Sequence, residues 1–243
     1  MARWIEGEVI ANHHWTDTHH SLRVRAPVVP FQAGQFSRLA QTIEGRVIAR
    51  PYSFVNPPQD EVLEFYSTVV PEGPFSSRLQ ALTPGDPILV APRGAGCFTL
   101  DRVPDAPSLW LLATGTALGP FLSILRTDEP WQRFRRIVLV HAARHRPELA
   151  YRELIESLPP ALTYLPVVSR EPCPDALAGR IPALIASGEL EQAADASLTP
   201  DQAQVMICGN PDMVQDTARV LGERGLQPNN RKQTGHVTTE QYW

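Results

Sequence analysis

Cysteine is scarce in this sequence, with three residues in 243, at Cys97, Cys173 and Cys208. Residues so far apart provide neither a disulfide framework nor the clustered thiolates of an iron–sulfur or zinc site, which favours a reducing compartment. No stretch is long and apolar enough to span a membrane, and charged residues interrupt the first ten positions, which excludes a signal-peptide core. We therefore expect a cytoplasmic protein without a membrane segment or a metal site.

An excess of positive charge is also missing, because 22 basic and 26 acidic side chains give a formal net charge of −4. No global attraction for nucleic acid follows, although a local basic face could dock an acidic partner. Disorder is excluded as well. The composition is 43% hydrophobic, and 243 residues can bury the core of one large domain or two ordinary ones.

The amino-terminal part of the chain has the pattern of an antiparallel β-barrel. Short β-rich runs alternate with turns that contain proline or glycine, at residues 5–11, 22–25, 36–39, 47–54, 63–70 and 87–91. One short helix is predicted in this part, at residues 76–82.

After residue 101 the pattern becomes that of a parallel α/β domain. Apolar runs at residues 109–113, 137–142, 162–168 and 205–208 alternate with helical segments at 119–125, 148–158, 181–187 and 211–224. The Asp and Pro residues between 100 and 107 are typical of a linker, so the sequence predicts two domains, residues 1–101 and 102–243.

A cation, a proline, an aromatic ring and a hydroxyl follow one another at Arg50, Pro51, Tyr52 and Ser53, at the end of a predicted strand. On a strand, Arg50 and Tyr52 share one face. Arginine can bind a pyrophosphate in a bidentate way, an aromatic ring can stack on a flat heterocycle, and a hydroxyl can bond a ring nitrogen. These are the needs of a flavin site, although for these four residues alone an ordinary strand with a surface arginine and a half-buried tyrosine is the favoured explanation.

Two loops before predicted helices are candidate phosphate sites. Ser76 follows Gly73 at a helix start, where a hydroxyl and backbone N–H groups form either an anion site or simply a helix cap. The segment from Thr114 to Pro120 has the strand–loop–helix pattern of a nucleotide site. Ala117 stands there at the second glycine position of the dinucleotide fingerprint, so this motif is weak by itself.

Cys208 stands before Gly209, Asn210 and Pro211, at the end of a predicted strand. In open α/β sheets, ligands bind along the edge at which the strands end. The cysteine is therefore either a buried apolar residue or a contact to a reacting ring.

Arg144, Arg170 and Arg180 stand near the ends of the other predicted strands. Arginines at the ligand edge suit the 2′-phosphate that distinguishes NADP from NAD, whereas a single one is explained by solvation. No acidic residue clearly occupies the position that would bind an unphosphorylated ribose, with Glu171 as the open alternative.

Four histidines form two pairs at His13, His14, His19 and His20. Their stretch is predicted to be an exposed strand and turn. No acidic or cysteine ligand joins them at a characteristic spacing, which argues against a metal site.

Taken in order, these motifs resemble the plant-type ferredoxin–NADP reductase superfamily, most closely the bacterial ferredoxin or flavodoxin reductases whose chain ends in tyrosine and tryptophan. The resemblance covers nearly the whole chain. The motifs are RPYS at 50–53, EFYSTVV at 64–70, GPFSSRL at 73–79, ATGTALGP at 113–120, VLVHAAR at 138–144, VVSR at 167–170, GRIP at 179–182 and CGNP at 208–211.

The resemblance implies an FAD-binding β-barrel domain, an NADP-binding α/β domain and a monomeric protein. It implies a flavoenzyme that transfers hydride between nicotinamide C4 and flavin N5 and exchanges single electrons with ferredoxin or flavodoxin. By the same resemblance, the residues beside the reacting rings are Ser53, Cys208 and Tyr242. Glu240 is a candidate for the proton route.

The resemblance also assigns the FAD contacts. Arg50 and Ser76 would bind the pyrophosphate, Tyr52 would stack on the isoalloxazine, and Ser53 would approach N5. Further contacts are implied at Pro51, Tyr66, Pro74 and Phe75, with Tyr242 and Trp243 capping the flavin.

For the second cofactor, the resemblance implies that Thr116 lies between flavin and nicotinamide. The adenosine end of NADP would be bound by Ala143, Arg144, Ser169, Arg170 and Arg180, and the opposite side lined by Asn210, Pro211, Asp212 and Asp216.

Other functions stay open: an NADH-dependent reductase that serves an oxygenase, a free flavin reductase, or a non-catalytic flavin electron-transfer subunit. The three arginines argue against NADH. A fused iron–sulfur domain, common in oxygenase partners, would need length and clustered cysteines that this sequence lacks.

Overall fold

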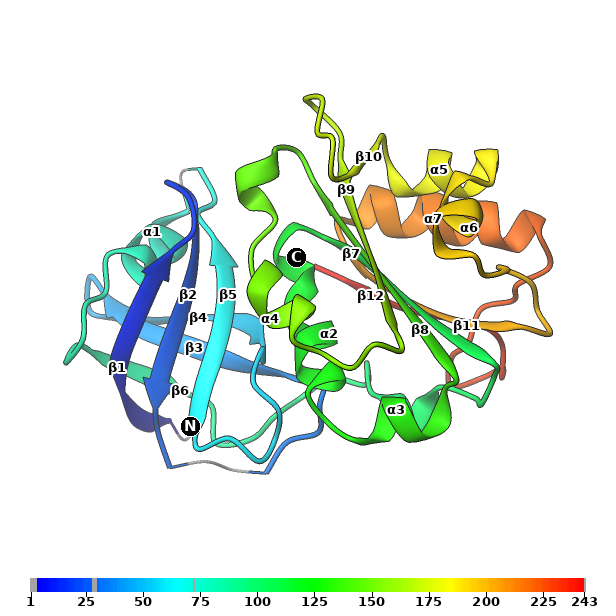
Figure 1. Ribbon diagram of the computed structural model, residues 1–243. Coiled ribbons are helices and arrows are strands. Elements are labelled where there is room, and N and C mark those ends of the chain that lie inside the picture. Colours follow the sequence, from blue (N-terminus) through cyan, green and yellow to red (C-terminus); the bar gives the residue numbers. More distant parts are fainter. Residues whose placement is uncertain (1–3, 28–29, 72, 243) are drawn as a thin grey trace. The chain divides into compact units, whose positions relative to one another are not determined.

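The computed structural model describes residues 4–27, 30–71 and 73–242, so Trp243 of the predicted site lies outside the described residues. Contacts divide the chain into two compact units (Figure 1). The first comprises Met1–Thr99 and Gly119–Thr127, and the second comprises Leu100–Leu118 and Asp128–Trp243. Each unit contains a six-stranded sheet.

The first unit has an antiparallel sheet in the order β4-β3-β6-β1-β2-β5. Its strands are β1 Ile5–His14, β2 His19–Arg25, β3 Phe36–Ile43, β4 Arg46–Ser53, β5 Val62–Thr68 and β6 Pro87–Val90. A bridge between Phe54 and Phe65 connects the chain after edge strand β4 to edge strand β5, so the sheet curls towards a barrel. Apolar residues that alternate along the strands, among them Leu22, Val24 and Leu63, fill its interior.

Helix α1 (Pro74–Gln80) begins two residues earlier than predicted. Gly73 is its N-cap and Pro74 its first residue, where proline costs no backbone hydrogen bond. Ser76 is therefore a residue of the first turn, and its expected position at the helix cap is wrong.

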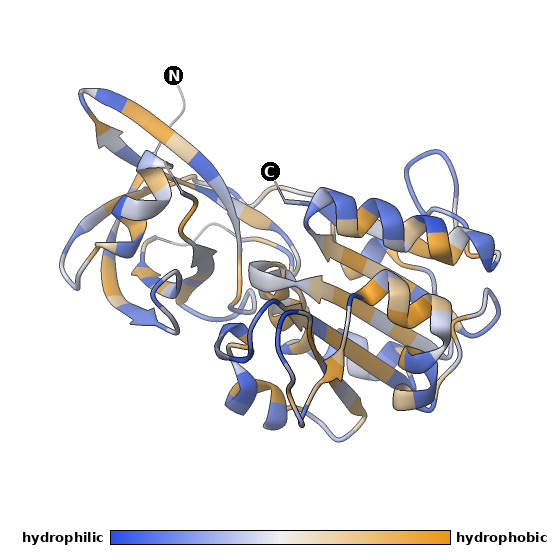
Figure 2. Ribbon diagram, turned by 90° about the horizontal axis from the view of Figure 1, so that it is seen from above, coloured by the Kyte–Doolittle hydropathy of each residue, from blue (hydrophilic) through white to orange (hydrophobic). Residues whose placement is uncertain are grey.

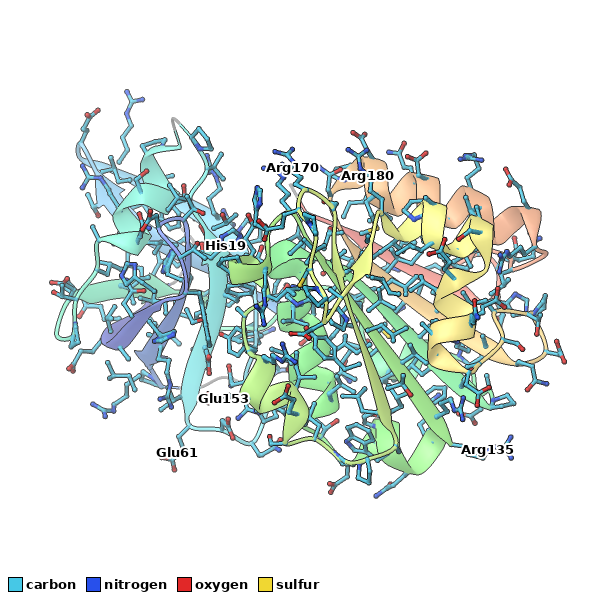
Figure 3. The ribbon with its side chains drawn as sticks, turned by 45° about the horizontal axis from the view of Figure 1, so that its top comes forward. His19, Glu61, Arg135, Glu153, Arg170 and Arg180 are labelled. Atoms are coloured by element: carbon cyan, nitrogen blue, oxygen red, sulfur yellow. The ribbon has the colours of Figure 1, made fainter. Side chains whose placement is uncertain are left out.

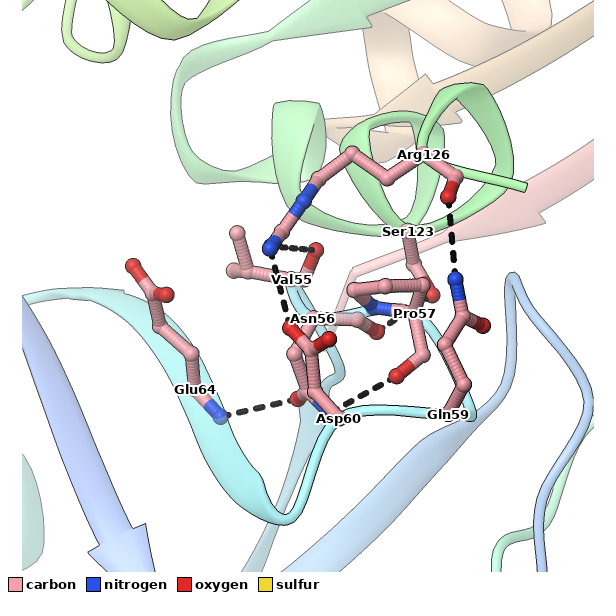
Figure 4. A network of polar contacts seen from close by, with 8 residues as sticks. All are labelled: Val55, Asn56, Pro57, Gln59, Asp60, Glu64, Ser123 and Arg126. Atoms are coloured by element: carbon pink, nitrogen blue, oxygen red, sulfur yellow. Dashed lines mark hydrogen bonds and ion pairs between the residues drawn. The ribbon is translucent and has the colours of Figure 1, made fainter.

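Helix α2 (Leu118–Leu125) follows the first strand of the parallel sheet, yet residues Gly119–Thr127 belong to the first unit. Ser123 donates its hydroxyl proton to the carbonyl of Asn56 at 2.7 Å (Figure 4). Arg126 pairs with Asp60 at 2.9 Å. Polar contacts between residues more than sixty positions apart thus tie this helix to the loop after β4.

The β1–β2 hairpin holds the carboxyl end of α1 through a buried polar chain. Asn12 Nδ2 lies 3.1, 3.0 and 2.9 Å from the carbonyl oxygens of Leu79, Gln80 and Leu82, to which it donates. Asn12 Oδ1 lies 2.8 Å from His20 Nδ1, which must therefore carry the ring proton. The expectation of an exposed histidine stretch is wrong for His19 and His20, which are both buried, His20 fully as this donor.

His20 should make the stability of the first unit depend on pH. Burial, followed by the charges of His14 and His19, lowers the pKa of His20 from 6.5 to about 4. The folded chain holds the ring neutral while the unfolded chain binds a proton below pH 6.5. The free energy of unfolding should therefore fall as pH drops from 6.5 to about 4, by up to ~1.4 kcal/mol per pH unit.

Denaturant titrations across this range check the expectation. His20→Gln should lose this part of the pH dependence, because an amide does not titrate. His13→Gln is the matched control, since His13 is exposed on the same hairpin, and it should keep the pH dependence. An unaltered slope in His20→Gln would contradict a neutral buried ring.

The second unit has a parallel sheet in the order β10-β9-β8-β7-β11-β12. Its strands are β7 Ser108–Thr114, β8 Arg136–Ala143, β9 Leu162–Val168, β10 Leu177–Ala178, β11 Ala203–Gly209 and β12 Val237–Gln241. The central strands β7, β8 and β11 are mostly apolar and buried along nearly their whole length, as expected where both faces are covered (Figure 2).

Helices α5 (Ile181–Ser187), α6 (Glu189–Ala194) and α7 (Pro211–Glu223) share one apolar core with this sheet. Two shorter helices are α3 (Glu129–Arg133) and α4 (Arg152–Glu156), and short 3₁₀ turns are η1 (Leu100–Arg102), η2 (Gly115–Ala117) and η3 (Arg146–Glu148). The predicted helix at 148–158 is wrong, because Tyr151 adopts a left-handed conformation (φ 63°) that separates η3 from α4. None of the described helices combines the length and apolar character needed to cross a bilayer.

Candidate functional site

The register of the parallel sheet brings the strand ends of the second unit to one edge. Ala143 pairs with Val168 and Val168 pairs with Ala178, while Cys208 pairs with Glu240 on the other side of the sheet. Ligands of open α/β sheets bind at this edge. The predicted site residues that lie at or just after the strand ends are Thr116, Ala143, Arg144, Ser169, Arg170, Arg180, Cys208, Asn210, Pro211 and Tyr242.

Three of these residues are arginines that the described part of the chain leaves without a counter-ion. The side chains of Arg144, Arg170 and Arg180 are exposed and form no hydrogen bond or ion pair with any described residue. Figure 3 shows Arg170 and Arg180 extending from the same edge of the sheet. Guanidinium groups without an ion pair have all their donors available, and they suit a bound phosphate.

A thiol and a carboxyl lie next to each other on β11 and β12. Cys208 is fully buried, and burial together with the charge of Glu240 raises the pKa of its thiol, against a smaller lowering by a hydrogen bond with Tyr242. Burial raises the pKa of Glu240 to about 7, and its Oε2 has no hydrogen-bond partner among the described residues. The edge therefore holds a neutral thiol and a carboxyl that changes protonation near neutral pH.

Glu240 could not be placed from the sequence because its strand was missed. The run VTTEQ of β12 contains one apolar residue, too few to indicate a buried strand. Its pairing with β11 fixes the position of Glu240 all the same.

Hydrogen bonds hold the loops at this edge. Two of the residues that form them, His141 and Thr114, were not among the predicted site residues. His141 Nε2 lies 3.2 Å from the carbonyl oxygen of Gly115, in the loop before α2. The backbone N–H of Asn210 donates to Thr114 Oγ1 at 3.3 Å, which connects the ends of β7 and β11. The Asn210 side chain caps α7 by accepting from the N–H of Asp212 at 3.0 Å.

Other predicted residues of this unit have local roles. Ser169 Oγ donates to the carbonyl of Ala143 at 3.2 Å, which extends the contact between β8 and β9. Pro211 is the first residue of α7. Asp216 lies one turn further along α7, with its carboxylate 4.0 Å from Arg219.

In the first unit, β4 and α1 bring several predicted flavin contacts together. The ring centroids of Tyr52 and Phe75 are 6.1 Å apart with an interplanar angle of 31°. Burial raises the pKa of Tyr52 to about 12, so its hydroxyl keeps the proton. Arg50 is exposed, donates to the carbonyl of Ala49 at 2.9 Å, and forms no ion pair with a described residue. Pro51 is tolerated because β4 is an edge strand.

Ser76 has a structural role that the sequence did not indicate. Its hydroxyl accepts from the N–H of Val70 at 3.0 Å and donates to the carbonyl of Gly73 at 3.3 Å. The hydroxyl proton is thereby used within the turn. Ser53, at the end of β4, and Tyr66, on β5, are both buried.

Among the described residues, no group of three or more His, Cys, Asp or Glu side chains could hold a metal ion.

Gly209 should be required for the close approach of β7 and β11. Its φ is +153°, and a Cβ there would lie 2.1 Å from Thr114 Oγ1 and 2.7 Å from Met213 Cε. We expect Gly209→Ala to lower the free energy of unfolding by about 1–3 kcal/mol in denaturant titrations. Gly222→Ala, in the open on α7, should instead stabilise by up to ~1 kcal/mol. No loss in Gly209→Ala would contradict the close packing.

The chain is similar over its whole length to known reductases. The family model described as oxidoreductase NAD-binding domain matches residues 111–219. The flavodoxin/ferredoxin–NADP reductases of Shigella flexneri and Escherichia coli (strain K12) are each 48% identical over 248 residues, which cover 100% of both chains. A crystal structure of a ferredoxin NADP⁺ reductase from Neisseria gonorrhoeae with bound FAD and NADP has a TM-score of 0.96 at 32% identity, with 100% of both chains covered.

Proposed function

Since the chain belongs to the flavodoxin/ferredoxin–NADP reductase family, we propose that it transfers electrons between NADPH and flavodoxin or ferredoxin. It is an oxidoreductase with FAD and NADP(H) as cofactors. The observation that carries the proposal is the set of three arginines without a counter-ion at the strand ends of the second unit. The cytoplasmic location and the monomeric state of the protein stay predictions.

The residues of the first unit fit FAD. When bound, FAD accepts a hydride from the nicotinamide and exchanges electrons singly with the carrier. Arg50 has guanidinium donors available for the pyrophosphate, and the Tyr52–Phe75 pair offers an aromatic surface for stacking. Because the Ser76 hydroxyl is used within its turn, we assign the pyrophosphate mainly to Arg50. The further contacts proposed are Pro51, Ser53, Tyr66 and Pro74.

In the second unit, Arg144, Arg170 and Arg180 would bind the 2′-phosphate of NADP(H). Five guanidinium N–H donors on each side chain match phosphate oxygens, and no described carboxylate competes for them. The other residues proposed to contact this cofactor are Thr116, Ala143, Ser169, Asn210, Pro211, Asp212 and Asp216. Tyr242, hydrogen-bonded to Gly209 through its backbone, would contact the flavin together with Trp243.

The function predicts a coloured protein with a preference between the two nicotinamides. The purified chain should show flavin absorbance that bleaches under anaerobic conditions faster with NADPH than with an equal concentration of NADH. Arg170→Ala should lower the rate at limiting NADPH about tenfold and leave the rate with NADH unchanged, because NADH has no 2′-phosphate.

Arg135→Ala is the matched control, since Arg135 is an exposed arginine before β8, at the opposite end of that strand (Figure 3). The Arg135→Ala variant should be reduced by NADPH and by NADH at the same rates as the unaltered chain. Equal reduction by NADH would contradict the arginine assignment, and failure to bind FAD even after reconstitution would contradict the function itself.

We also propose that Glu240 exchanges the proton that accompanies hydride transfer, beside the neutral thiol of Cys208. Its pKa of about 7 lets it donate and accept at physiological pH. In wild type, kcat/KM for dye reduction by NADPH should change around pH 7. Glu240→Gln should lose that transition and reduce turnover by at least about tenfold.

A stability measurement provides the structural control for this assignment. The folded carboxyl is neutral up to about pH 7, whereas the unfolded one ionises above 4.5. The contribution of Glu240 to stability is therefore lost as pH rises from 4.5 to about 7. Glu240→Gln should abolish this loss; if it persists, the carboxyl titrates normally and the proton role is wrong.

A further inference from the structure

One carboxylate connects the two loops that carry Arg144 and Arg170. Glu171 Oε1 accepts from the backbone N–H of Arg146 at 2.6 Å, and Oε2 lies 3.2 Å from His145 Nδ1. These two hydrogen bonds, the backbone one first, lower the pKa of Glu171, so the group is charged at neutral pH. Both oxygens of the side chain therefore bind the neighbouring loop of the protein.

The position of this contact in the chain gives it functional meaning. Glu171 directly follows Arg170, and His145 directly follows Arg144. The backbone N–H of Arg170 donates to the carbonyl of Arg144 at 3.0 Å, so β8 and β9 stay paired up to these residues. The Glu171 carboxylate continues the connection between the two loops beyond that bond, next to the two exposed arginines.

A second carboxylate reinforces the same loop. Arg146 pairs with Asp175 at 2.9 Å, and Arg152 lies 3.8 Å from the same carboxylate. Arg146 is thus held through its backbone by Glu171 and through its side chain by Asp175. Each exposed ion pair contributes little alone, but the backbone bond fixes a loop without ordering a long side chain.

We propose that Glu171 is a positioning residue for NADP specificity: it holds Arg144 and Arg170 in adjacent loops at the places that the 2′-phosphate requires. The inference rests on the proposed function. It also favours a positioning role over the alternative in which Glu171 binds an unphosphorylated ribose, because both oxygens of this side chain already bind the neighbouring loop.

Two effects of removing this carboxylate have opposite signs, which makes the proposal testable. Loss of a negative charge close to an anion site would by itself tighten phosphate binding. Loss of the loop contact would weaken it. A weaker affinity after neutralisation therefore identifies positioning as the dominant effect.

The experiment is calorimetric titration of the FAD-loaded full chain with 2′,5′-ADP and with 5′-AMP, which lacks only the 2′-phosphate. Glu171→Gln should weaken the affinity for 2′,5′-ADP by about three- to tenfold and leave the affinity for 5′-AMP unchanged. Glu171→Ala should weaken the affinity for 2′,5′-ADP more than Glu171→Gln does, because glutamine still offers an acceptor to the N–H of Arg146. Thermal unfolding and flavin content should match wild type in both variants.

Glu153→Gln is the control for charge, because Glu153 is an exposed residue of α4 in the same unit (Figure 3). This variant should bind 2′,5′-ADP with at least the affinity of wild type. Unchanged or tighter binding in the Glu171 variants would overturn the proposal, as would an equal loss for both ligands, which indicates general loosening. If wild type itself does not prefer 2′,5′-ADP over 5′-AMP, the proposed NADP site is wrong as well. If wild type shows the preference and both variants retain it, only the positioning role of Glu171 is wrong.

Discussion

The in-register parallel pairing of β7 to β12 is the constraint on which the site of the second unit depends. Parallel strands that start together also end together, so each turn after a strand opens at the same edge. Residues as far apart in the sequence as Thr114 and Asn210 thereby become neighbours. The pairing is stabilised by apolar side chains far from the edge, which leaves the edge free to carry charged groups.

Burial gives the groups at that edge their different chemistry. Arg144, Arg170 and Arg180 follow strands β8, β9 and β10 and stay in solvent, where a charged side chain costs little. Cys208 and Glu240 lie inside β11 and β12, where burial disfavours the charged form of both. One sheet edge thus offers permanent cations for an anion and, a few strands away, a carboxyl whose proton can leave near pH 7.

Patterns in the sequence predicted those strands, motifs and cofactors whose signal lies in the local composition of the chain. The six β-rich runs and the four apolar runs became strands. The family resemblance and the enzyme class are confirmed by full-length relatives at 48% identity, and the two cofactors by a full-length solved relative at 32% identity. The roles of individual site residues stay predictions. Elements that are short or have little apolar content were missed, among them β10, α6 and β12, because their places depend on pairing with or packing against other elements.

The errors share a physical cause. The helix expected at 148–158 fails at Tyr151, whose backbone no side-chain periodicity reveals, and α2 joins the first unit through bonds to a loop sixty residues away. A periodicity reports which face of an element is buried, and it says nothing about which partner covers that face.

The same reasoning explains why the polar residues that hold the loops were not recognised. Asn12, Thr114 and Glu171 bind backbone atoms, and every residue except proline offers the same N–H and carbonyl groups. A side chain that binds the backbone therefore has no complementary residue type that would indicate the contact in the sequence. An ion pair or an apolar stripe, by contrast, requires particular residue types and can be recognised from them. Residues that bind cofactors can be recognised by their chemistry, whereas residues that position them become visible only when the fold supplies their partners.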